Sequence, residues 1–94
     1  MRKVTRRFNI ALNSAVLTTR FVLHENKPIL SVFHHEEDGI WEFIGDDICA
    51  DDSDYLVISL DEIINLDTSI LEISELPAGK SAQRAGKNQP WIIR

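Results

Sequence analysis

Asp38-Gly39-Ile40-Trp41-Glu42-Phe43-Ile44-Gly45-Asp46-Asp47 is the stretch of sequence around which the chain is organised. The Asp-Gly pair at its start is a strong turn signal, and a second glycine marks its end. Side chains alternate between the two faces of a strand, so Trp41 and Phe43 share one face and Glu42 lies on the other. We predict a strand over residues 40–44, with both aromatic rings in the core and Glu42 toward water.

The segments before this strand predict a hairpin. Residues 15–23 are rich in Val, Thr, Phe and Leu, which is a strand composition, and residues 29–33 have the same character. Between them, residues 25–28 read Glu-Asn-Lys-Pro, which is a turn signal. We therefore expect the two segments to pair as neighbouring antiparallel strands.

After the central strand, the chain predicts a loop, three more strands and two short helical segments. Residues 45–54 form a loop with five aspartates, and residues 55–59 read as a strand. Ser59 and Glu62 match a capping box, which predicts a helix through about residue 65. Asp67 is a second candidate N-cap, for a segment through about residue 73. A last hairpin is expected, with strands at 81–85 and 91–93 and a turn at 86–89.

These elements predict one α+β domain over residues 15–94. An antiparallel sheet of about five or six short strands would carry one or two short helices on one face. Residues 1–14 are basic in their first half and lack a clear period, so we expect an N-terminal arm, mobile or poorly ordered.

Size and composition indicate a small globular domain of the cytoplasm. The chain has 94 residues, of which 44% are apolar and 27% are charged, with a net charge of −5. No run of apolar residues approaches the roughly 18 needed to span a bilayer. The single cysteine excludes an intrachain disulfide, which is typical of a reducing compartment.

Charge is distributed in three blocks along the chain. Residues 1–27 hold six Lys or Arg and one acid, residues 28–79 hold fourteen acids and no Lys or Arg, and residues 80–94 hold four Lys or Arg and no acid. An acidic middle of this kind repels nucleic acid and membrane surfaces and attracts cations or a basic protein.

This block leads to the main functional hypothesis, a non-enzymatic protein that presents an acidic face to a basic protein partner. The loop that follows Phe43 would be the centre of the face. The residues expected to bind the partner are Glu36, Glu37, Asp38, Asp46, Asp47, Asp51, Asp52 and Asp54.

Two other kinds of protein stay open. A small regulatory domain could bind a metal or another ligand through the Asp-rich loop and the pair His34-His35. Adjacent residues of a strand point to opposite faces, however, and the aspartates lack the spacing of an EF-hand loop, so no metal ligand is assigned. A structural or regulatory homodimer is the other alternative.

Catalytic motifs are incomplete. Gly79-Lys80-Ser81 resembles the end of a phosphate-binding loop, but the pattern requires a glycine where this chain has Ser74. Cys49 could form a nucleophile pair with a nearby His, but the sequence shows no third group that would orient the pair. The sequence therefore predicts no enzyme, no catalytic residue and no cofactor.

The order of several short motifs resembles small uncharacterised bacterial proteins that are related to immunity proteins of polymorphic toxin systems. The resemblance covers about residues 16–92 and implies no catalytic residue. The motifs are Val16-Leu17-Thr18-Thr19-Arg20, Pro28-Ile29, His34 with Asp38-Gly39-x-Trp41-x-Phe43, Ser59-Leu60-x-Glu62-Ile63, Asp67-x-Ser69-Ile70, Leu76-Pro77-x-Gly79, Ala82-x-Arg84 and Trp91.

Overall fold

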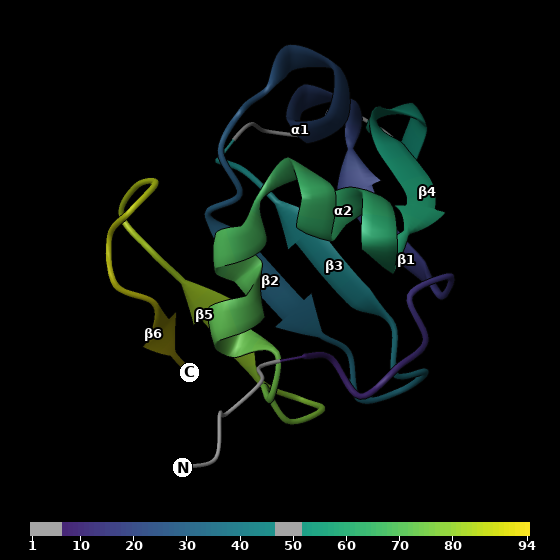
Figure 1. Cartoon of the computed structure of the whole chain (residues 1–94), viewed down its shortest axis with the longest axis vertical. Coiled ribbons are helices and arrows are strands. Elements are labelled where there is room, and N and C mark those ends of the chain that lie inside the picture. Colours follow the sequence, from purple (N-terminus) through teal and green to yellow (C-terminus); the bar gives the residue numbers. More distant parts are fainter. Residues whose placement is uncertain (1–6, 47–51) are drawn as a thin grey trace, which may run out of the picture.

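The computed structural model describes residues 7–46 and 52–94 and shows an α+β fold (Figure 1). The strands are β1 Ala15–Thr19, β2 Ser31–His34, β3 Trp41–Ile44, β4 Tyr55–Ser59, β5 Ser81–Gln83 and β6 Ile92–Ile93. The helical segments are α1 Arg20–Glu25, η1 Asp52–Asp54, α2 Leu60–Leu66 and η2 Thr68–Ile73, of which η1 and η2 are 3₁₀ helices. In Figure 1, α2 and η2 lie across one face of the sheet, and α1 lies at one end of it.

The six strands form one mixed sheet in the order β4-β1-β3-β2-β5-β6. The predicted strand number is confirmed, but the purely antiparallel sheet is wrong because β1 and β3 are parallel, with Leu17 opposite Glu42. The predicted pairing of residues 15–23 with 29–33 is also wrong. The tight β2–β3 hairpin inserts β3 beside β1, so that β1 contacts β3 and β4 instead of β2.

The second half of the first predicted strand is the helix α1. Thr19 ends β1 and caps the helix, because its hydroxyl accepts a hydrogen bond from the Val22 N–H at 3.4 Å. Asn26 ends the helix in the left-handed conformation, with φ of 55°. These two caps define a helix of six residues within a segment whose composition favours a strand.

Elements with strong local signals lie where the sequence predicts them. β4 has the predicted bounds, and Ser59 and Glu62 form the capping box that starts α2. The Asp67 side chain accepts from the Ser69 N–H and caps η2. β5 and β6 pair as the predicted closing hairpin.

The core lies between the sheet and the helices α2 and η2. Trp41 and Phe43 are buried as predicted. The buried apolar residues are Phe8, Val16, Val22, Ile29, Val32, Trp41, Phe43, Leu60, Ile63, Ile70, Ile73, Leu76 and Ala82.

Phe8 corrects the expectation of an N-terminal arm that lies outside the domain. Its side chain is 5% exposed and packs edge-on against Trp41, with ring centroids 4.8 Å apart, and against Phe43 at 5.9 Å. The described residues before β1 are therefore held to the domain through an aromatic contact.

Candidate functional site

The predicted acidic residues lie at two opposite ends of the sheet. Glu36, Glu37 and Asp38 form the exposed turn that joins β2 to β3. Asp46 follows β3, and Asp52 begins η1 near the start of β4; both are exposed. The four residues of β3 alone separate the two groups by about 13 Å. The structure therefore does not bring them together into a single face, and Asp47 and Asp51 lie outside the described residues.

Asp54 is not an exposed carboxylate, contrary to the sequence prediction. Its side chain is 8% exposed and accepts a hydrogen bond from Nε of Arg20 at 2.8 Å. Arg20 also pairs with Glu25 at 3.2 Å and stacks over Phe21. Asp54 thus links the start of β4 to α1 and has a structural role.

Glu42 is a second correction. It lies on the face opposite Trp41 as predicted, but its side chain is only 14% exposed. His35 covers it, with Nε2 of His35 2.8 Å from Oε1 of Glu42. His35 also stacks near Phe33, with ring centroids 6.1 Å apart. The carboxylate is therefore paired on the sheet surface and does not simply face water.

The β2–β3 turn borders a hollow that the sequence did not predict. The hollow has a volume of about 560 Å³ and lies between this turn, the N-terminal segment and the chain after η2. Among the described residues, two carboxylates line it, and no Lys or Arg does. Its lining residues are Asn9, Ile10, His34, Asp38, Gly39, Trp41, Ser74, Glu75, Leu76 and Pro77. We call this hollow the acidic groove.

The acidic groove has a rigid aromatic wall. His34 stacks on Trp41, with ring centroids 4.1 Å apart and an angle of 17° between the rings. Nδ1 of His34 lies 2.8 Å from the carbonyl oxygen of Leu76. A carbonyl can only accept, so Nδ1 carries a proton, and in the neutral ring Nε2 is then an acceptor. His34 is held in place from both sides.

One carboxylate of the acidic groove is oriented by the backbone. Asp38 accepts a hydrogen bond from the Ile40 N–H at 3.0 Å, and Gly39 next to it has φ of 73°, which favours glycine. Glu75, on the segment that follows η2, also lines the groove, and its side chain is exposed. The groove therefore offers negative charge beside an apolar and aromatic surface.

A basic residue lies close to the same turn on its other side. Lys80 lines a neighbouring hollow together with Glu36 and Glu37. The chain approaches closely there, because the Gly79 N–H donates to the His34 carbonyl at 2.7 Å. The acidic block of the sequence is thus partly balanced in space by the basic residues that flank it.

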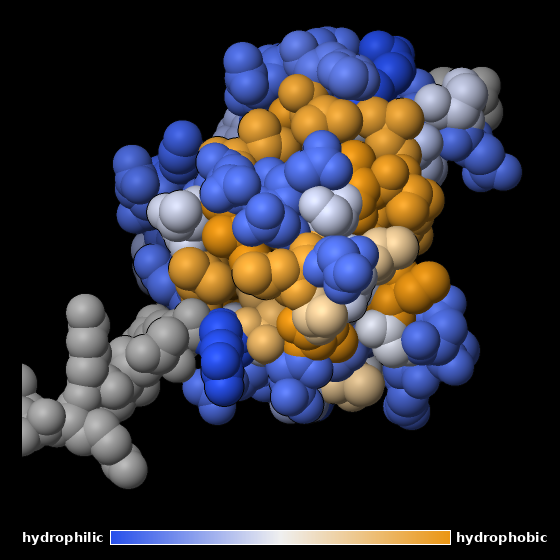
Figure 2. Space-filling view, turned by 45° about the vertical axis from the view of Figure 1, so that its right-hand side comes forward, coloured by the Kyte–Doolittle hydropathy of each residue, from blue (hydrophilic) through white to orange (hydrophobic). Residues whose placement is uncertain are grey.

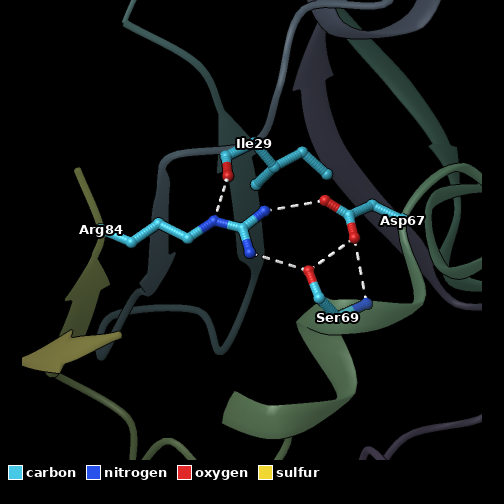
Figure 3. Close-up of polar contacts among 4 residues, drawn as sticks. All are labelled: Ile29, Asp67, Ser69 and Arg84. Atoms are coloured by element: carbon cyan, nitrogen blue, oxygen red, sulfur yellow. Dashed lines mark hydrogen bonds and ion pairs between the residues drawn. The ribbon is translucent and has the colours of Figure 1, made fainter. Parts of the chain in front are cut away.

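A buried ionic network surrounds Arg84 (Figure 3). The guanidinium donates through Nη2 to Asp67 at 2.8 Å, through Nη1 to Ser69 at 2.8 Å, and through Nε to the Ile29 carbonyl at 2.9 Å. Its other surface stacks on Trp91, 4.2 Å from the ring centroid. The side chain is 1% exposed, so this network is part of the core structure.

The network also sets the charge state of Asp67. Burial would raise the pKa of Asp67, but hydrogen bonds from Ser69 and the charge and hydrogen bond of Arg84 outweigh burial, so that the pKa lies below its ordinary value. Both partners of the buried pair are therefore charged at neutral pH.

Within the described residues, no three His, Cys, Asp or Glu side chains lie close enough together to hold a metal ion. Cys49 lies outside them, together with the rest of residues 47–51 of the Asp-rich loop. No helix in the described parts of the chain is both long enough and apolar enough to cross a membrane.

Sequence reasoning missed the contribution of Glu75 to the acidic groove. The groove is built from segments near residues 10, 38 and 75, and no local pattern indicates that they meet. The Leu76-Pro77 pair after η2 is the one local sign of a chain reversal there.

Comparison with family models, curated proteins and solved structures finds no match to this chain.

Proposed function

We propose that this protein is a non-enzymatic interaction protein that binds a basic protein partner through the acidic groove. The observation that carries the proposal is the groove's lining: Asp38 and Glu75 supply negative charge, Ile10 and Pro77 supply exposed apolar surface, and no Lys or Arg of the described residues lines it. A Lys or Arg side chain with an apolar neighbour matches this combination in charge and in shape.

The wider charge distribution supports the same partner. The net charge is −5, and the turn residues Glu36 and Glu37 lie next to the groove and are exposed. Such a field raises the rate at which a basic partner arrives, while the close contacts set how long it stays.

We further propose an immunity-type role, in which the partner is a toxin. The motif order that resembles relatives of immunity proteins supports this role. A toxin that cleaves nucleic acid carries a basic cleft, and a rigid protein with exposed carboxylates can occupy it.

Charge reversal tests the groove. The double variant Asp38→Lys with Glu75→Lys should slow association with the purified partner at least about tenfold at low salt, because both carboxylates that line the groove become cations. The partner would be a protein captured from the native host by pull-down and then purified, and association would be followed by surface plasmon resonance at several salt concentrations.

The matched control makes the same change of charge at the other end of the sheet. Asp46→Lys with Asp52→Lys alters the net charge equally, and both residues are exposed. Equal slowing by both double variants would show that only the overall field matters, and unchanged association in both would refute binding at the groove.

A further inference from the structure

β4 is an edge strand with an apolar and uncharged sequence. It lies at the end of the strand order, and within residues 7–46 and 52–94 no strand pairs with its outer side. Tyr55-Leu56-Val57-Ile58-Ser59 contains no Lys, Glu, Asp, Pro or Gly, which are the residues that protect natural edges. The opposite edge, β6, has only two residues. β4 is therefore the edge of this sheet that can accept another strand.

The pairing with β1 shows which peptide groups of β4 face outward. The Leu60 N–H donates to the Ser14 carbonyl at 2.9 Å, next to the pair Ala15–Ser59. Antiparallel strands alternate between hydrogen-bonded and non-hydrogen-bonded pairs, so the even-numbered residues of β4 bond to β1 and the odd-numbered ones point away. Accordingly, the Ser59 N–H points away from β1 and donates a hydrogen bond to the Glu62 carboxylate at 3.4 Å.

Val57 is the centre of this edge. By the same alternation, its N–H and C=O both point away from β1. The residue is 67% exposed, the largest value among the exposed large apolar residues that the structure describes. In Figure 2 the side of the molecule that carries β4 is turned forward, and apolar residues reach the surface there among hydrophilic ones.

The charges at the two ends of β4 indicate whether a second copy of this chain or a strand of another protein fits this edge. Asp52 is exposed before the strand, and Asp61 and Glu62 are exposed after it. If a second copy paired antiparallel about Val57, the end of β4 near Asp52 in one copy would come close to the end near Asp61 and Glu62 in the other. Like charges in that position repel, so self-pairing is disfavoured. A strand with Lys or Arg at its ends would instead meet a carboxylate at each end.

We propose that β4 binds an extended segment of a partner protein, which adds to the sheet as an antiparallel strand and carries basic residues on both sides of an apolar centre. The N–H and C=O of Val57 exchange hydrogen bonds with one residue of that segment. The flanking cations lie near Asp52 at one end and near Asp61 and Glu62 at the other. This surface is separate from the acidic groove and does not depend on it.

Synthetic peptides test the proposal on the full chain. The probe is acetyl-Lys-Lys-Val-Thr-Val-Lys-Lys-amide, titrated to millimolar concentration into ¹⁵N-labelled protein and followed by NMR. The amide signal of Val57 should shift and exchange more slowly with solvent, with smaller shifts in β1. No shift of β4 at millimolar peptide would refute the proposal, as would shifts confined to another region.

Two control peptides separate hydrogen bonding from charge. A peptide with Glu in place of every Lys should bind at least about tenfold more weakly, because it meets Asp52 and Glu62 with like charge. A peptide methylated on the backbone nitrogen of its central residue loses a ladder hydrogen bond and should bind more weakly by a similar factor. Equal binding of all three peptides would overturn strand addition.

A protein variant completes the test. Val57→Pro removes the outward N–H without removing a donor to β1, so it should abolish the β4 shifts while the circular dichroism spectrum is retained. The methylated peptide decides the question if that variant does not fold. Light scattering of the free protein should show a monomer, and a dimer that Val57→Lys dissociates would refute the choice of occupant.

Discussion

At the scale of single residues, Arg84 shows how one buried side chain joins distant parts of the chain. Its guanidinium contacts the Ile29 carbonyl before β2 and Asp67 between α2 and η2, while its flat surface covers Trp91. A buried cation is costly unless every donor and charge is matched, and here acceptors surround it. Arg84 belongs to one of the motifs in the sequence, but the motif does not indicate a role. The contacts in the structure show that the role of Arg84 is structural.

Asp67 gives a pH dependence of stability with a definite sign. Its pKa in the folded protein lies below the unfolded value of about 3.9, so the unfolded state binds more protons in acid. The stabilisation by charged Asp67 is complete above that unfolded value and is lost as pH falls through the lower folded pKa.

The substitution Asp67→Asn should therefore cost about 3–5 kcal/mol at neutral pH, because Arg84 is left as a buried charge without its counter-ion. Its difference from the wild type should shrink as pH falls below about 4, where the wild type also loses the carboxylate. Urea unfolding at a series of pH values measures this. Asp46→Asn is the exposed control and should stay within about 0.5 kcal/mol of the wild type. A difference in the free energy of unfolding between Asp67→Asn and the wild type that does not change with pH would contradict the prediction.

At the scale of elements, capping decides where strands give way to helices. Residues 20–23 belong to a segment with the composition of a strand, yet residues 20–25 form α1 because Thr19 caps one end and Asn26 the other. α2 follows β4 without a loop because Ser59 ends the strand and caps the helix at once. The junction of β4 with α2 was predictable, since Ser59 and Glu62 form a complete capping box. The junction of β1 with α1 was not, because Thr19 has no Glu or Gln three residues later.

Ser59→Ala should destabilise the fold by about 1 kcal/mol, because the Glu62 N–H loses its acceptor at 3.1 Å and the capping box opens. Thermal unfolding followed by circular dichroism measures the loss. Thr68→Ala is the matched control, as Thr68 is exposed and caps no helix, and it should have little effect. An equal loss in both variants would show that the hydroxyl of Ser59 is not acting as a cap.

At the scale of the whole molecule, tertiary structure redistributes the charges that the sequence groups together. Glu36, Glu37 and Asp38 lie at one end of the sheet and Asp46 and Asp52 at the other, while Asp54 is buried against Arg20. Conversely, Glu75, which lies far from Asp38 in the sequence, lines the same groove. A run of charged residues in the sequence therefore does not define one face of the protein, because residues that flank a strand on its two sides lie at opposite ends of the sheet.

The attachment of the N-terminal segment is a property of the whole fold and can be tested through Phe8. Phe8→Ala should destabilise the protein by about 3–5 kcal/mol, since it removes a buried ring that contacts Trp41 and Phe43. Leu12→Ala is the control in the same segment, because Leu12 is 58% exposed and should cost far less. Urea unfolding followed by tryptophan fluorescence compares the two, and equal small losses would contradict the core role of Phe8.

Local patterns of residues were enough to predict several elements of this fold. Alternation placed Trp41 and Phe43 on the buried face, a capping box started α2, and turn residues framed β3 and the closing hairpin. Neighbouring residues carry these signals because strand alternation and capping act over two to four positions.

Three features could not be predicted from local patterns: the parallel pairing of β1 with β3, the burial of Phe8 and Asp54, and the lining of one groove by both Asp38 and Glu75. Each depends on which segments come together across long stretches of chain, and that choice is made by the burial of a shared core, which leaves no periodic trace in any one segment.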